Sequence, residues 1–419
     1  MSKYYRHFKI SRTWKNVLAS LFVLFCTLNA NAATWHVNTV LNTGGNLGTK
    51  TGSFEFCLSN AGSSDHIAFD LLTGSSPWVI ALPSGSPQIL NKNSVLIDGT
   101  TAPGYVAGGS KPLVELDGAA NSVPIGLTIT GGSCIVKALS FTGFTTEDIL
   151  VSTGSNTIIS CYIGVEPDGS TVSGSPVGIF VDDVTSTNIG GQAPGSTGNV
   201  IAAFSSGSPS TTKGIYLANG ASSNNVYNNI IGLDYTGANP IGGQAYGIYV
   251  DLNGNSNNII NNVVSNCSVD GVYLNCASTN LSQNLIGTDI TAANAVPNGV
   301  GVYVTGTANF IGVSPINSTG NTISGNTTNG VVLDGFTGGA DNNVAGNIIG
   351  LNGPAITGGT SPVPNGKNGI LIVYGGNTGN TIGGSSFSLQ NTISGNDSSG
   401  INLVNTSGNT IQGNYIGFN

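Results

Sequence analysis

Two short hydrophobic patterns recur along the chain from about residue 150 onward. In the first, an apolar residue follows Thr or Asn, a second Asn usually lies three positions later, and the long copies end in Ile-Gly or a similar pair. The aligned apolar residues are Ile158, Val226, Leu281, Val344 and Ile411, with shorter copies around Ile259, Ile323 and Ile393. Self-similarity at this spacing predicts a solenoid, in which each repeat stacks on its neighbours.

The second pattern is a strand of the form Gly-apolar-x-apolar. Because side chains alternate along a strand, the two apolar residues should face the interior, as for Ile179 and Val181, and the residue between them should face out. The copies are Gly178–Val181, Gly214–Leu217, Gly247–Val250, Gly271–Leu274, Gly301–Val304, Gly330–Leu333, Gly369–Ile372 and Gly400–Leu403. Their starts lie 24 to 39 residues apart, which is enough for one coil and an occasional inserted loop.

Asparagine recurs three positions after the aligned apolar residue of the first pattern, where the chain is expected to turn. Asn tolerates the left-handed backbone region, and its amide can hydrogen-bond to the same group one coil above and below. We therefore predict a structural ladder, with Cys161 as an exception. Its members are Asn229, Asn262, Asn284, Asn326, Asn347, Asn396 and Asn414.

The repeats resemble those of right-handed parallel β-helix proteins, the pectate-lyase-like superfamily that includes many exported bacterial surface proteins. The resemblance covers roughly residues 125 to 419 and rests on Asn-Thr-Ile-x-Gly-Asn, at 321–326 and 391–396, and on Ile-Gly-x-Asp, at 231–234 and 286–289. It implies an all-β chain folded as a single-stranded right-handed parallel β-helix with an N-terminal cap. It does not predict an activity, because this superfamily holds lyases, hydrolases, epimerases, adhesins and inert scaffolds.

Three segments follow from this interpretation. Residues 1–32 have the basic start, the apolar stretch and the Ala30-Asn31-Ala32 end of a secretory signal peptide, so we expect a secreted or cell-surface protein. Residues 33–125 are expected to form the N-terminal cap and the first coils. Residues 126–419 carry the β-helix repeats.

A short helix and several strands are expected within residues 33–139. Phe54, Cys57 and Leu58 lie at i, i+3 and i+4 after Ser53, which predicts an amphipathic helix that covers the first coil. The predicted strands are Trp78–Leu82, Val95–Ile97, Leu113–Leu116, Leu127–Ile129 and Ile135–Leu139.

The chain stops in the middle of a long repeat, at 416–419, where earlier copies continue into a loop and another strand. No cap is visible there. The expectation is that a C-terminal region is missing or that a partner covers the last coil.

Composition narrows the possible partners. Without residues 1–32 the chain has no arginine and six lysines against 19 acidic residues, a net charge of 6 − 19 = −13. Such a surface repels phosphate backbones, so nucleic acid is not an expected partner. No later stretch is long and apolar enough to span a membrane. The five remaining cysteines could pair as Cys134–Cys161 or Cys267–Cys276, or remain buried single thiols.

Candidates for catalysis are few. Asp182 and Asp183, at a predicted strand exit, and Glu147 and Asp148, one or two coils earlier, are the best carboxyl pairs for a hydrolase of neutral glycans. Adjacent acids at a strand end are more often a solvated turn. The pectin-cleaving enzymes hold sugar carboxylates with basic residues, and the mature chain has no arginine for this purpose.

Metal binding has one candidate set and no established motif. Glu166, Asp234 and Asp289 each follow an Ile-Gly-type glycine by two residues and could hold a structural Ca²⁺. The alternative is that each caps its own turn. No other metal and no cofactor is expected.

The outward residue of five consecutive Gly-apolar-x-apolar strands is aromatic. These residues are Phe180, Tyr216, Tyr249, Tyr273 and Tyr303. They could bind sugar rings, or they could only stabilise one another as a ladder. The function predicted is therefore a non-catalytic scaffold or adhesin, with a polysaccharide or a cell-surface glycan as the possible ligand on this aromatic face. The alternative is a polysaccharide-active lyase or glycoside hydrolase.

Overall fold

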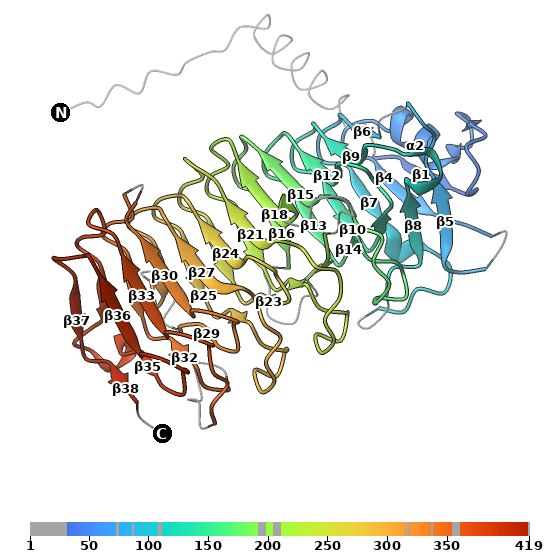
Figure 1. The fold of residues 1–419 in the computed structure, drawn as a ribbon. Coiled ribbons are helices and arrows are strands. Elements are labelled where there is room, and N and C mark those ends of the chain that lie inside the picture. Colours follow the sequence, from blue (N-terminus) through green and yellow to red (C-terminus); the bar gives the residue numbers. More distant parts are fainter. Residues whose placement is uncertain are drawn as a thin grey trace, which may run out of the picture.

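The computed structural model describes residues 32–417, apart from 73–74, 86–87, 108–110, 192–197, 204–210, 315, 317–318, 337 and 354–360. The predicted signal peptide thus lies almost wholly outside the described residues. In the described part of the chain, no helix is long and apolar enough to cross a membrane. The described chain winds into a rod of stacked coils, with the N-terminal coils at one end and the C-terminal coils at the other (Figure 1).

Each complete coil contributes one strand to each of three sheets, here called A, B and C, of 15, 12 and 11 strands. Sheet A is longer because it also includes an N-terminal strand and an antiparallel hairpin. Sheet A contains β1 (Thr34–Val37), β2 (Gly45–Asn46), β3 (Thr51–Gly52), β4 (His66–Phe69), β7 (Leu96–Asp98), β10 (Ile135–Lys137), β13 (Thr157–Ile159), β16 (Asn188–Gly190), β19 (Asn225–Tyr227), β22 (Asn258–Ile260), β25 (Asn280–Ser282), β28 (Phe310–Gly312), β31 (Asn343–Ala345), β34 (Thr381–Gly383) and β37 (Thr410–Gln412).

Sheet B contains β5 (Trp78–Ala81), β8 (Val114–Asp117), β11 (Ser140–Thr142), β14 (Tyr162–Ile163), β17 (Val200–Ile201), β20 (Ile230–Ile231), β23 (Val263–Val264), β26 (Leu285–Ile286), β29 (Thr322–Ile323), β32 (Ile348–Ile349), β35 (Thr392–Ile393) and β38 (Tyr415–Ile416). Sheet C contains β6 (Ile89–Leu90), β9 (Ile125–Ile129), β12 (Glu147–Val151), β15 (Val177–Asp182), β18 (Lys213–Ala218), β21 (Tyr246–Val250), β24 (Asp270–Leu274), β27 (Val300–Val304), β30 (Val331–Asp334), β33 (Ile370–Val373) and β36 (Ile401–Val404).

The strand order confirms the predicted parallel β-helix. From β4 onward every third strand joins the same sheet, and all pairings between named strands are parallel except that of β2 with β3. Most copies of the Thr/Asn-apolar pattern form strands of sheet A, the following short strand belongs to sheet B, and Gly-apolar-x-apolar forms sheet C. The copies around Ile323 and Ile393 were aligned wrongly, because they form β29 and β35 of sheet B. Parallel pairing is continuous across residue 125, because β9 pairs with both β6 and β12.

Side chains that face inward stack in vertical rows. Ile179 pairs with Ile149 on one side and with Ile215 on the other, and all three are fully buried. Val181 is also fully buried, so the predicted alternation in this strand is confirmed. The glycine before each such pair has a packing reason, since a Cβ on Gly178 would lie 2.6 Å from the carbonyl oxygen of Gly214 in the next coil.

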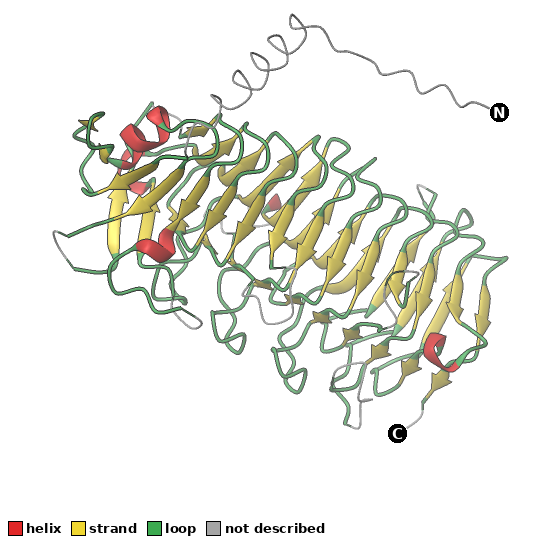
Figure 2. Cartoon of the chain, turned by 180° about the vertical axis from the view of Figure 1, so that it is seen from behind, coloured by secondary structure: helices red, strands yellow, loops and turns green. Residues whose placement is uncertain are grey.

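A short helix and a hairpin lie at the N-terminal end (Figure 2). Helix α2 (Phe54–Asn60) begins at Ser53, whose hydroxyl accepts a hydrogen bond of 3.3 Å from the N–H of Phe56. Phe54, Cys57 and Leu58 are buried, as the spacing predicts. The antiparallel strands β2 and β3 form the edge of sheet A beside β1. Three short 3₁₀ helices complete the described elements: η1 (Gly99–Thr101), η2 (Ala119–Asn121) and η4 (Phe387–Leu389).

The seven predicted ladder asparagines fall into two ladders rather than one. Five of them, Asn229, Asn262, Asn284, Asn347 and Asn414, belong to a ladder at the corner between sheets A and B. This ladder has eight members, because Asn199, Asn321 and Asn391 also belong to it. Asn326 and Asn396 belong to a second ladder, at the corner between sheets B and C, with Asn298 and Asn365. A third, at the corner between sheets C and A, includes Asn309, Asn342, Asn380 and Asn409.

One of the two predicted reasons for asparagine at these corners was wrong, whereas the expected amide hydrogen bonds between coils are present. None of the seven asparagines has a positive φ; the residue before each takes the left-handed conformation, as Asn228 does at φ 60° and Asn261 at φ 59°. The Asn side chains instead satisfy buried polar groups. Asn262 Oδ1 accepts hydrogen bonds from the N–H and from Nδ2 of Asn229, and Asn262 Nδ2 donates to Asn284 and to the carbonyl of Val226.

The cysteines do not form the disulfides considered from the sequence. All five described cysteines are free and buried. Cys134, Cys161 and Cys267 occupy corner positions, and the N–H of each donates to the first Asn oxygen of the adjoining corner row. These three cysteines therefore occupy inward-facing positions of the coil. This agrees with the second of the two alternatives, in which the cysteines are buried single thiols.

Candidate functional site

The outer face of sheet C carries a continuous column of aromatic side chains, here called the aromatic column. Strand register places Phe180, Tyr216, Tyr249, Tyr273 and Tyr303 directly beside one another on β15, β18, β21, β24 and β27. All five side chains are half-buried. The column lies on the face predicted from the alternation of the strands.

The rings of the column pack closely on one another. Centroids of Phe180 and Tyr216 are 5.0 Å apart with an interplanar angle of 9°, and those of Tyr249 and Tyr273 are 4.5 Å apart at 16°. Tyr216 and Tyr249 meet edge to face at 87°. These geometries are the favourable offset-stacked and T-shaped arrangements, so the column stabilises the sheet whatever else it does.

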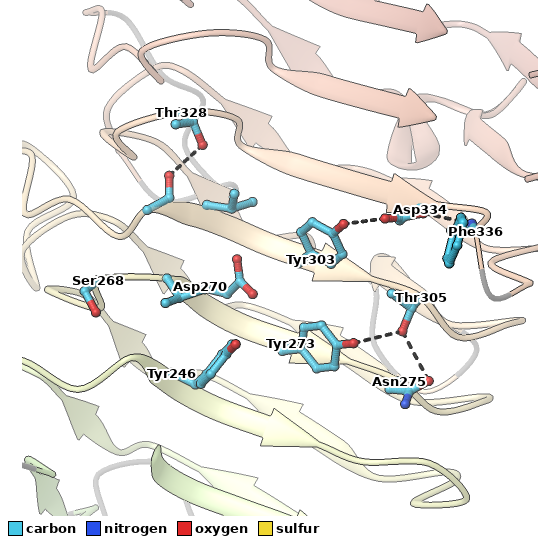
Figure 3. A pocket seen from close by; sticks show the side chains of 13 residues that line it. Tyr246, Ser268, Asp270, Tyr273, Asn275, Tyr303, Thr305, Thr328, Asp334 and Phe336 are labelled. Atoms are coloured by element: carbon cyan, nitrogen blue, oxygen red, sulfur yellow. Dashed lines mark hydrogen bonds between the residues drawn. The ribbon is translucent and has the colours of Figure 1, made fainter. Parts of the chain in front are cut away.

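Near the C-terminal end of the column, a pocket of about 640 Å³ opens on sheet C (Figure 3). We call it the sheet C pocket. It is lined by Tyr246, Ser268, Val269, Asp270, Tyr273, Asn275, Gly299, Val300, Tyr303, Thr305, Thr328, Asp334 and Phe336. Tyr273 and Tyr303 are the more loosely stacked pair, with centroids 5.8 Å apart.

Asp270 was not among the residues predicted from the sequence. It is 4% exposed at the start of β24, in register with Tyr246 on one side and Val300 on the other. Burial raises the pKa of its carboxyl to about 7. A signal was present, since Asp270 is the only acidic residue directly before the glycine of a Gly-apolar-x-apolar copy. Tyr246, at the same position one coil earlier, was missed too.

Carboxylates at the border of the aromatic column accept hydrogen bonds from two of its tyrosine hydroxyls. The hydroxyl of Tyr216 donates to Asp251 over 2.9 Å, and that of Tyr303 donates to Asp334. Burial, and then the hydrogen bond to Asp251, raise the pKa of Tyr216 to about 12. These tyrosines therefore stay protonated as hydrogen-bonding groups throughout the physiological pH range.

A lysine covers the middle of the aromatic column. Lys213 Nζ lies 4.7 Å from the ring centroid of Tyr216 and 5.1 Å from that of Tyr249. Burial lowers the pKa of Lys213, against the opposing attraction of Asp251. The middle of the column therefore already holds an ammonium group of the protein, whereas the sheet C pocket is lined by no basic side chain.

The four acidic residues considered for catalysis are not brought together. Asp182 accepts a hydrogen bond of 2.7 Å from Asn219, and Asp183 is exposed in a left-handed turn at φ 52°. Glu147 is in register with Val177, at the opposite end of the strand from Asp182. Asp148 is fully buried in the rod, where burial raises its pKa well above the usual value.

The acidic residues considered for Ca²⁺ lie in loops that follow sheet B strands. Asp289 accepts hydrogen bonds from Thr291 Oγ1 at 2.7 Å and Asn294 Nδ2 at 2.6 Å, and Asp234 has the same pattern in its own loop. These contacts are those of a carboxylate that organises its turn. Within the described residues, no three His, Cys, Asp or Glu side chains are grouped to hold a metal. A structural Ca²⁺ stays an untested prediction.

Comparison with known proteins gives similarity of fold alone. No protein-family model and no curated protein sequence matches the chain. The Dettilon tailspike protein gp208 is 15% identical, with a TM-score of 0.47 over 83% of this chain and 63% of its own, so the chain spans less than two thirds of that protein. The A-module of the mannuronan C-5 epimerase AlgE6 from Azotobacter vinelandii is 12% identical, with a TM-score of 0.42 over 97% of this chain and 95% of the module.

A third solved structure, an alginate lyase from Paenibacillus sp. str. FPU-7, is 14% identical, with a TM-score of 0.37 over 90% of this chain and 99% of the lyase. The assignment of the fold rests on the strand pairing within the chain itself.

Proposed function

We propose that this chain is a secreted or cell-surface β-helix protein that binds carbohydrate on the outer face of sheet C and serves as a scaffold or adhesin without acting on its ligand. The observation that carries this proposal is the sheet C pocket, in which Tyr246, Tyr273, Tyr303 and Phe336 lie beside carboxyl, hydroxyl and amide groups. Aromatic rings bind the apolar faces of sugar rings, and the polar groups are suited to sugar hydroxyls.

The size and placement of the pocket support binding of a chain-like ligand. A volume of about 640 Å³ falls within the range of about 300–1,000 Å³ typical of small-molecule sites. Residues from four neighbouring strands, β21, β24, β27 and β30, line it, so a bound glycan would run along the rod. The predicted signal peptide is consistent with a ligand outside the cell.

The test is binding to a panel of plant, algal and bacterial polysaccharides by the wild type and by a Tyr273→Ala, Tyr303→Ala double variant. Loss of two central aromatic contacts should weaken binding about tenfold to a hundredfold. Tyr235→Ala is the matched control, because Tyr235 is an exposed tyrosine outside the pocket. Melting temperatures of all variants report whether the rod remains folded. Equal binding by the folded double variant contradicts the proposal.

The alternative function is a polysaccharide-active enzyme, and one observation favours it. Asp270 and Asp334 line the same pocket, and paired carboxyl groups in differing environments are the machinery of glycoside hydrolases. The same panel is therefore assayed for new reducing or unsaturated ends. Product that disappears in both Asp270→Asn and Asp334→Asn would replace the non-catalytic proposal with the enzymatic one.

A further inference from the structure

The sheet C pocket contains two carboxyl groups and no counter-charge of its own. None of its 13 lining residues is Lys, Arg or His. Asp334 is already engaged, since it accepts hydrogen bonds from the Tyr303 hydroxyl and, over 2.8 Å, from the N–H of Phe336. The field inside the pocket therefore favours a cation and opposes an anion.

Asp270 is the unengaged carboxyl of the pocket. Among the described residues it has no hydrogen-bond or ion-pair partner, although its side chain is almost fully buried at 4% exposure. Figure 3 shows this side chain among the rings of Tyr246, Tyr273 and Tyr303. A carboxyl that is almost fully buried and has no partner has lost most of its hydration without compensation, so a donor supplied by a ligand would stabilise it.

The same face already shows how it accommodates an ammonium group. Lys213 occupies the row of sheet C that continues through Tyr246 to Asp270, and its Nζ lies over the rings of Tyr216 and Tyr249. Tyrosine faces attract cations through the ring quadrupole. Two coils further on, the rings of Tyr273 and Tyr303 are present together with an acid instead of a lysine.

We propose that the sheet C pocket binds an amino sugar unit of a glycan, with the ammonium group at Asp270 and the pyranose ring against Tyr273 and Tyr303. This inference rests on the proposed carbohydrate-binding function and specifies its ligand class. An N-acetylated sugar lacks the charge that pairs with Asp270. A uronic acid would add a third carboxylate to a pocket without a basic side chain.

Binding of an ammonium group should change the protonation of Asp270. Burial raises the pKa of this carboxyl to about 7, so at pH 6 most of it is protonated when the pocket is empty. The polar and charged groups around it are Tyr246 on β21, Tyr273 on β24, Tyr303 on β27 and Cys267, which precedes β24. The nearby cation is Lys213, whose Nζ lies over the Tyr246 ring, 5.9 Å from its centroid, and does not line the pocket. The ligand ammonium must therefore itself stabilise the carboxylate, and the proton of Asp270 is released to solvent.

The test is calorimetric titration at pH 6 with three soluble probes: a β-1,4-linked glucosamine tetrasaccharide, its fully N-acetylated counterpart and tetragalacturonate. The wild type should bind the amine at least about tenfold more tightly than either other probe. Repeating the titration in buffers with different ionisation enthalpies should show release of up to about one proton per site. Asp270→Asn should abolish both the preference and the proton release.

Asp397→Asn is the matched control, because it removes one negative charge at an exposed residue outside the pocket and should change neither result. An Asp270→Asn protein that stays folded and keeps the preference for the amine overturns the inference. The inference is also overturned if the wild type binds the acetylated or the uronic probe as tightly as the amine. If that binding is lost in the Tyr273→Ala, Tyr303→Ala variant, the proposed carbohydrate-binding function still holds. Failure to bind any glycan of the probes or the panel overturns both proposals.

Discussion

The corners of the coils and the outer face of sheet C share one strand register, but their side chains are used differently. At the corner between sheets A and B, asparagine follows asparagine for eight coils, and each amide bonds to the next. On sheet C, the row that contains Ile125 and Glu147 continues through Val177, Lys213, Tyr246, Asp270 and Val300. The row of asparagines forms hydrogen bonds with buried backbone groups of the rod. The residues of the varied row share no such structural role.

This difference indicates where a ligand should be sought in a repeat protein. A residue that every coil needs is repeated, so a departure from the repeat on an exposed face is free to serve another purpose. Asp270 is such a departure, and the sheet C pocket lies around it. The predictions below test whether the corners carry the stability of the rod and the sheet C face carries binding.

The largest effect is expected from breaking the corner ladder. Asn262→Ala would leave the N–H and Nδ2 of Asn229 and the carbonyl of Val226 without their partner at a buried corner. Several unsatisfied buried groups should together lower the free energy of unfolding by about 3–5 kcal/mol. Denaturant unfolding of the variant and the wild type at neutral pH measures this loss of stability.

Asn258→Ala in the same coil is the matched control. Asn258 also belongs to a row of amides, bonded to Asn225 and Asn280, but this row lies half-buried on the outer face of sheet A, where water can replace the lost bonds. We expect a loss below about 1 kcal/mol. Equal losses in the two variants would show that burial of the corner is not what makes its ladder important.

The second effect is a pH-dependent stabilisation by Asp270→Asn. Because the pKa of Asp270 is raised in the folded protein, its protonated carboxyl contributes to the free energy of unfolding. This contribution is fully present below the pKa of the unfolded chain, near 4, and is lost as pH rises through about 7. Above pH 7 the folded wild type carries an unpaired buried charge. The variant should therefore gain about 2–4 kcal/mol relative to the wild type between pH 4 and pH 8.

Unfolding midpoints at both pH values measure this gain. A difference between variant and wild type that does not change with pH would mean that Asp270 ionises in the folded protein as readily as in the unfolded one.

A smaller effect is expected in the loop of Asp289. Although burial acts to raise the pKa of Asp289, hydrogen bonds from Asn294 and Thr291 hold it below its usual value. Its stabilisation is thus present above about pH 4 and is lost as pH falls through the lowered pKa. Asp289→Ala should cost about 1–2 kcal/mol at pH 7 and less at pH 3.

Melting of the wild type with and without a calcium chelator belongs to the same experiment. An unchanged melting temperature in chelator would remove Ca²⁺ from the account of these loops, and a lowered one would support it. A cost of Asp289→Ala that stays constant down to pH 3 would show that the carboxylate form is not the stabilising one.

Much of the fold could be predicted because short-range sequence patterns determine it. Alternation alone placed Ile179 and Val181 inside and Tyr216 outside, and the i, i+3, i+4 spacing located the helix at Phe54. The repeat also indicated that asparagines line the turns. It did not separate the corner of Asn229 from that of Asn326, because both follow an apolar strand by the same number of residues.

The sheet C pocket could not be predicted in the same way, since it depends on which residues of neighbouring coils lie side by side. Loops of unequal length separate Lys213, Tyr246 and Asp270 in sequence, and only the pairing of β18, β21 and β24 aligns them. Asp148, in contrast, was considered for catalysis from the sequence although the fold buries it. Its neighbour Glu147 faces out, but the strand turns Asp148 into the interior, where no substrate reaches it.

The smallest expected effect distinguishes the two halves of the aromatic column. Lys213→Met keeps the aliphatic packing but removes the ammonium group over Tyr216 and Tyr249, which should cost about 0.5–1 kcal/mol of stability. The same change removes a positive charge near the sheet C pocket, so the glucosamine tetrasaccharide should bind about twofold to threefold more tightly at low salt. Lys111→Met, which removes an ammonium group 3.9 Å from the Tyr235 ring on a different face, should leave that affinity unchanged. If both lysine variants alter binding equally, the effect comes from net charge, and the middle of the column is not continuous with the pocket.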